Sequence, residues 1–83
     1  MAAQMGQEES FDIFRQCAVE VLQVDPSRIT PEARFADDLD ADSLDLVELV
    51  MALEERFGID VPESELEGVQ TVGQAYELVA SKL

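Results

Sequence analysis

The chain has 83 residues, enough for one small domain and too few for a second with its own core. Its net charge of −14 should repel nucleic acids and anionic lipid surfaces, and no apolar run is long enough to span a membrane. Without histidine it lacks the usual catalytic base, and its lone cysteine, Cys17, excludes an internal disulfide. These features predict an acidic protein of the reducing cytoplasm that binds basic proteins and is not an enzyme.

The first predicted element is a helix near the N-terminus. We expect residues 1–7 to form a flexible tail and residues 8–83 to form one domain. Ser10 is predicted to be the N-cap of the helix, which continues to Leu22. Its apolar residues recur at helical spacing on one face: Phe11, Phe14, Ala18, Val21 and Leu22. We predict that Cys17 is a small, partly buried core residue, because it lies about 60° around the helix from the apolar face. No cation is placed beside it to activate it as a nucleophile.

A long loop follows, from Asp25 to Asp42. It contains two prolines and no sustained helical period. Three apolar residues could pin it to the core, so we expect it to be ordered: Ile29, Phe35 and Leu39. The loop also contains alternating aspartates that resemble the start of a calcium-binding EF-hand loop. Ser43 and Leu49 stand where that motif needs glycine and glutamate, so we predict no metal site.

The strongest predicted helix covers residues 43–57. Asp42 or Ser43 should cap its start, and Gly58 should end it. One face is apolar and should meet the core: Leu46, Leu49, Val50, Leu53 and Phe57. The opposite face mixes acidic and apolar residues: Leu44, Glu48, Met51 and Glu55. This face suits either docking to a basic partner surface that has a shallow apolar depression, or ordinary exposure to solvent.

Two shorter elements complete the predicted fold. A short helical turn should begin at Pro62, place Leu66 inward and stop at Gly68. Thr71 and Gln74 form a capping box that starts the last helix. The apolar face of that helix is predicted to contain Val72, Ala75, Tyr76, Val79 and Leu83. The fold class is therefore all-α: a small antiparallel bundle of three main helices plus one short helix, with a long loop between the first and second helices.

Ser43, at the junction of the loop and the central helix, has three possible roles. It could be the helix N-cap, the commonest role for a serine at such a position. It could be a nucleophile, although no histidine exists to activate it. It could also be a covalent attachment point, because the free N–H groups at a helix N-terminus favour a phosphodiester.

The residues around Ser43 resemble a known family. Asp42-Ser43-Leu44-Asp45, with the following Leu46-Val47-Glu48-Leu49-Val50-Met51-Ala52-Leu53-Glu54-Glu55, is similar to the prosthetic-group site and recognition helix of acyl carrier proteins. The resemblance includes Phe35-Ala36-Asp37-Asp38-Leu39 upstream, and Phe57-Gly58-Ile59-Asp60-Val61-Pro62-Glu63 with Thr71-Val72 downstream. It covers nearly the whole chain, from about Glu9 to Lys82.

The resemblance implies a cofactor and a set of partners. Ser43 would carry 4′-phosphopantetheine from coenzyme A, added by a phosphopantetheinyl transferase, and growing acyl chains would be held on it as thioesters. The partners would be acyl transferases, ketosynthases, reductases and dehydratases with basic docking patches, and the carrier would be a monomer. The residues implied in partner binding are Asp42, Leu44, Asp45, Glu48, Met51, Glu54 and Glu55. Those implied in an acyl pocket are Phe35, Leu46, Val50, Phe57, Val61, Leu66 and Val69.

One residue departs from the family pattern. Bacterial fatty-acid carriers usually have glycine where Asp40 stands. The resemblance as a whole implies fatty acid biosynthesis, whereas Asp40 leaves open a discrete carrier of a polyketide or other secondary-metabolite pathway. A third possibility is an acidic helical interaction module without a prosthetic group.

Overall fold

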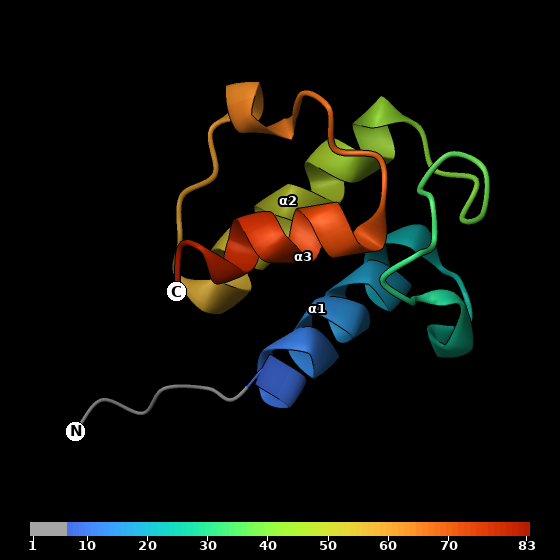
Figure 1. Ribbon diagram of the computed structural model, residues 1–83, viewed down its shortest axis with the longest axis horizontal. Coiled ribbons are helices and arrows are strands. Elements are labelled where there is room, and N and C mark those ends of the chain that lie inside the picture. Colours follow the sequence, from blue (N-terminus) through green and yellow to red (C-terminus); the bar gives the residue numbers. More distant parts are fainter. Residues whose placement is uncertain (1–6) are drawn as a thin grey trace.

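The computed structural model describes residues 7–83, which form helices joined by long connections (Figure 1). The main helices are α1 (Gln7–Leu22), α2 (Ser43–Phe57) and α3 (Val72–Ala80). Two short 3-10 helices, η1 (Pro26–Arg28) and η2 (Glu63–Leu66), lie in the connections. Helix α1 runs opposite to α2 and α3 (Figure 1). The prediction of a small all-α antiparallel bundle is confirmed. Helix η1 was not predicted, because a segment of three residues is too short to show a helical period.

Helix α1 begins earlier than the sequence predicted. It starts at Gln7, so all of the predicted tail except that residue lies outside the described residues. Ser10 is inside the helix and buried, and its hydroxyl lies 2.5 Å from the hydroxyl of Tyr76 on α3. The prediction that Ser10 caps the helix is therefore wrong. A distant tyrosine, which local sequence cannot indicate, gives this buried serine a hydrogen-bonding partner.

The core forms where the three helices and the first loop meet. Its fully buried side chains are Phe14, Ile29, Leu49, Leu53 and Val72. The rings of Phe11 and Phe14 pack edge-on against Tyr76, with centroids 5.2 and 5.9 Å away. The inward prediction for Leu83 is wrong, because α3 ends at Ala80 and the Leu83 side chain is 55% exposed.

The long first loop is ordered by burial and by backbone hydrogen bonds. Ile29, Phe35 and Leu39 are buried, as predicted. The Phe35 N–H donates to the Gln70 carbonyl (3.0 Å), and the Val72 N–H donates to the Ala33 carbonyl (2.9 Å). These bonds tie the loop to the chain that enters α3, and so place the start of α2 beside that chain.

No helix within residues 7–83 is both long enough and apolar enough to cross a membrane.

Candidate functional site

The start of α2 is fixed by a capping box between Asp42 and Asp45. The Asp42 carboxylate accepts a hydrogen bond from the Asp45 N–H (2.9 Å), and the Asp45 carboxylate accepts one from the Asp42 N–H (3.1 Å). Of the two predicted caps, the structure therefore selects Asp42. Gly58 ends the helix in the left-handed conformation, with φ of 68°, as predicted.

Ser43 is the first residue of α2 and is exposed. Because Asp42 supplies the cap, the Ser43 hydroxyl forms no hydrogen bond with any part of the chain that the structure describes. No base touches it, so a self-activated nucleophile is not supported. The hydroxyl is free to be modified by another enzyme, and the adjacent N–H groups and helix dipole favour an anionic substituent there. The local chemistry thus fits a phosphodiester group.

The loop before Ser43 is held by two arginines and one aspartate. The Arg28 guanidinium donates to the Asp38 carbonyl (2.6 Å), and the Asp38 carboxylate accepts a hydrogen bond from the Arg34 N–H (2.8 Å). Asp40 has φ of 57°, in the left-handed region that favours glycine and that aspartate also tolerates. This conformation explains why glycine suits the position and why aspartate can replace it.

A groove of about 490 Å³ opens beside Ser43. It contains four of the seven residues predicted for an acyl pocket: Phe35, Leu46, Leu66 and Val69. Ala41 and Gln70 also line the groove, and no sequence pattern indicated them, because their contribution depends on how the loop folds back. The volume of the groove is within the range of small-molecule sites. Its lining includes Phe35 and Gln70, whose segments are joined by the hydrogen bond from the Phe35 N–H to the Gln70 carbonyl.

The structure does not bring Val50, Phe57 and Val61 to this groove. Val50 and Val61 are buried, and Phe57 lies about 20 Å from Ser43 along α2, given the rise of a helix. A larger groove, of about 880 Å³, lies between α1 and α3. It contains none of the predicted site residues, so we place the candidate site at the smaller groove.

The outward face of α2 combines acidic and apolar side chains, as predicted. Leu44 and Met51 are 65% and 58% exposed, and Glu48 and Glu55 are exposed on the same helix. Asp42 and Asp45 are at its start. Glu54 is more restrained, because its carboxylate accepts a hydrogen bond from the Val61 N–H (2.8 Å). The face that contains Ser43 therefore offers charge together with apolar anchors.

Cys17 is buried in the core, as predicted. Loss of hydration on burial raises the pKa of its thiol, and the nearby Glu20 carboxylate acts in the same direction, whereas Arg56 opposes them. The thiol is therefore predominantly protonated at neutral pH, which fits a structural role.

Comparisons with known proteins agree with this geometry. A family model described as a phosphopantetheine attachment site matches residues 12–79. An acyl carrier protein of Picosynechococcus sp. is 49% identical over 75 residues, covering 90% of this chain and 93% of that protein. One from Thermosynechococcus vestitus is 44% identical over 79 residues, covering 95% and 98%. The chain belongs to the acyl carrier protein family, whose members are carriers rather than enzymes and hold acyl chains on 4′-phosphopantetheine for fatty acid biosynthesis.

Proposed function

We propose that Ser43 is the attachment point of the prosthetic group, within an acyl carrier domain that spans residues 8–83. The observation that carries this proposal is the exposed Ser43 hydroxyl, which makes no hydrogen bond within residues 7–83 because Asp42 caps the helix. A phosphopantetheinyl transferase would form the bond from Ser43 Oγ to phosphorus, while the pyrophosphate bond of coenzyme A breaks and its nucleotide leaves. When attached, the group supplies a terminal thiol for acyl thioesters.

The outer face of α2 would present this cargo to enzymes of fatty acid biosynthesis. The acidic side chains would steer basic docking patches, and exposed Leu44 and Met51 would hold them. Weak, rapid binding suits a carrier that visits acyl transferases, ketosynthases, reductases and dehydratases in turn. The high negative charge fits a monomeric protein of the cytoplasm that does not bind nucleic acid.

The groove beside Ser43 would shelter the acyl chain. Its apolar wall contains Phe35, Leu46, Leu66 and Val69, and it opens next to the attachment hydroxyl. An alkyl chain placed there would leave water, which is favourable in proportion to the apolar area buried.

Mass spectrometry tests the attachment. Wild-type protein incubated with coenzyme A and a broad-specificity transferase should gain one phosphopantetheine, and Ser43→Ala should gain none. Ser64→Ala, a change at another exposed serine, is the matched control and should be modified like the wild type. A full adduct on Ser43→Ala would overturn Ser43 as the attachment point, and an unmodified wild type would overturn the carrier function and favour a plain interaction module.

A further inference from the structure

Helix η2 contributes Leu66 to the lining of the groove but has little packing of its own. None of its residues is buried, and its N-cap, Pro62, makes no side-chain hydrogen bond to it. Leu66 is its half-buried residue and lines the groove together with Val69. A segment with so few buried contacts opens at a low free-energy cost unless something else holds it.

The connection from α2 to α3 is held near each end by a hydrogen bond to its main chain. Near the start, the Val61 N–H donates to the Glu54 carboxylate (2.8 Å). Near the end, the Gln70 carbonyl accepts a hydrogen bond from the Phe35 N–H (3.0 Å). Helix η2 lies between these two anchors, so its position depends on contacts made in the middle of the connection.

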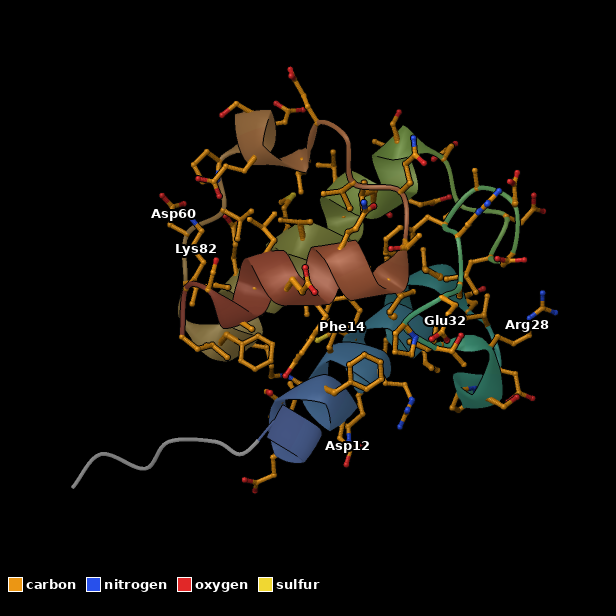
Figure 2. The ribbon with its side chains drawn as sticks, viewed as in Figure 1. Asp12, Phe14, Arg28, Glu32, Asp60 and Lys82 are labelled. Atoms are coloured by element: carbon orange, nitrogen blue, oxygen red, sulfur yellow. The ribbon has the colours of Figure 1, made fainter. Side chains whose placement is uncertain are left out.

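One such contact is an ion pair with the C-terminal end of the chain. The Lys82 ammonium lies 2.8 Å from a carboxylate oxygen of Glu65, and the two side chains are 26% and 38% exposed. Figure 2 shows Lys82 on the same side of the molecule as Asp60, which precedes η2. Within residues 7–83, the other ion pairs join residues three apart and are more exposed, whereas this one links distant segments. The Lys82–Glu65 pair can therefore restrain η2 as a tertiary contact.

We propose that the Lys82–Glu65 ion pair is a latch that fixes η2 beside the groove and thereby limits the length of acyl chain that the groove shelters. Lys82 and Glu65 are positioning residues, since they act through Leu66 and do not line the groove. When the pair breaks, η2 moves outward with Leu66, and the groove becomes wider and longer. This inference rests on the proposed function of the groove as an acyl shelter.

Hydrogen exchange of the unmodified full-length protein tests the latch by itself. In Lys82→Gln, the Glu65 and Val69 amides, which donate to Pro62 and Leu66, should exchange about two- to fivefold faster, as expected for loss of a partly exposed ion pair. Glu67→Gln changes an exposed neighbouring charge without breaking the pair and should leave these rates unchanged. The charge exchange Lys82→Glu with Glu65→Lys should restore slow exchange. Unchanged exchange in Lys82→Gln would overturn the latch.

Loaded protein tests the effect on cargo. Hexanoyl and tetradecanoyl thioesters of the wild type and Lys82→Gln would be cleaved with hydroxylamine, with the corresponding acyl pantetheines as unprotected references. In Lys82→Gln, the tetradecanoyl thioester should be cleaved more slowly and the hexanoyl thioester faster. The ratio of the tetradecanoyl rate to the hexanoyl rate should therefore fall by about two- to fivefold. General loosening of the fold would instead raise both rates.

The outcomes separate the latch from the function on which it rests. An unchanged ratio, with both thioesters protected in the wild type, would overturn the latch and leave the groove as the shelter. Thioesters that react like the free references in the wild type would overturn the shelter and the latch together. Failure to load Ser43 at all would overturn the proposed attachment as well.

Discussion

Leu44 and Leu49 lie one and a half turns apart on α2 and should respond in opposite ways to the same substitution. Leu49 is fully buried, whereas Leu44 is 65% exposed on the proposed docking face. Leucine and alanine are both strong helix formers, so helix propensity changes little at either position and burial decides the difference. Leu49→Ala should therefore lower the free energy of unfolding, while Leu44→Ala should weaken partner binding.

The size of the effect at Leu49 follows from its burial. Replacing a fully buried leucine with alanine removes apolar burial and leaves a cavity, at a cost of about 2–5 kcal/mol. A chain of 83 residues has a total stability of roughly 4–12 kcal/mol, so this loss is a large fraction of it. The Tm should fall by at least about 8 °C, since each kcal/mol corresponds to about 4–8 °C in a domain of this size. Leu44→Ala should stay within about 0.5 kcal/mol of the wild type.

Two assays on the same proteins separate the effects. Urea unfolding followed by circular dichroism gives the change in stability, and the KM of a phosphopantetheinyl transferase reports docking. Leu44→Ala should raise KM with little loss of stability, and Leu49→Ala should do the reverse at temperatures where it remains folded. Equal loss of stability in the two variants would refute the assignment of the helix faces.

Three other perturbations test the capping, charge and burial described above. Asp42→Ala should cost about 1 kcal/mol in urea unfolding through loss of the α2 cap, and Asp42→Asn should recover most of it; equal loss in both would contradict capping. Added salt should raise the Tm, because residues 37–67 contain twelve acidic side chains and one basic one; no rise from low ionic strength would count against self-repulsion. Because burial raises the pKa of the Cys17 thiol above its unfolded value, stability should fall as the pH rises through the alkaline range. In Cys17→Ala that part of the pH dependence should disappear, and its persistence would assign it to another group.

The local features of the site could be predicted from the sequence because they depend on neighbouring residues. The length of α2, its Gly58 end and the Thr71–Gln74 capping box follow from short-range hydrogen bonding and helix propensity. The division of α2 into a buried and an exposed face follows from helical periodicity. The serine beside an acidic helix was therefore recognisable before any tertiary contact was known.

Other features depend on segments that only the folded chain brings together. The sequence around Ser10 is typical of a helix cap, but in the folded chain Ser10 lies inside α1 and its hydroxyl meets Tyr76, 66 residues away. Val50 and Val61 have the apolar character of pocket residues, yet both are buried and neither lines the groove. Helical periodicity predicts that a side chain points inward, but it does not predict which distant segment that side chain contacts.

The sequence by itself determined α2 and the start of α3 with their local caps, the acidic face and the serine at its head, because each is set within a few residues of chain. The tertiary structure alone decided which apolar residues line the groove, that Ser10 meets Tyr76, and that Lys82 meets Glu65. These depend on the path of the loop and of the connection to α3, where burial and long-range hydrogen bonds outweigh local preference.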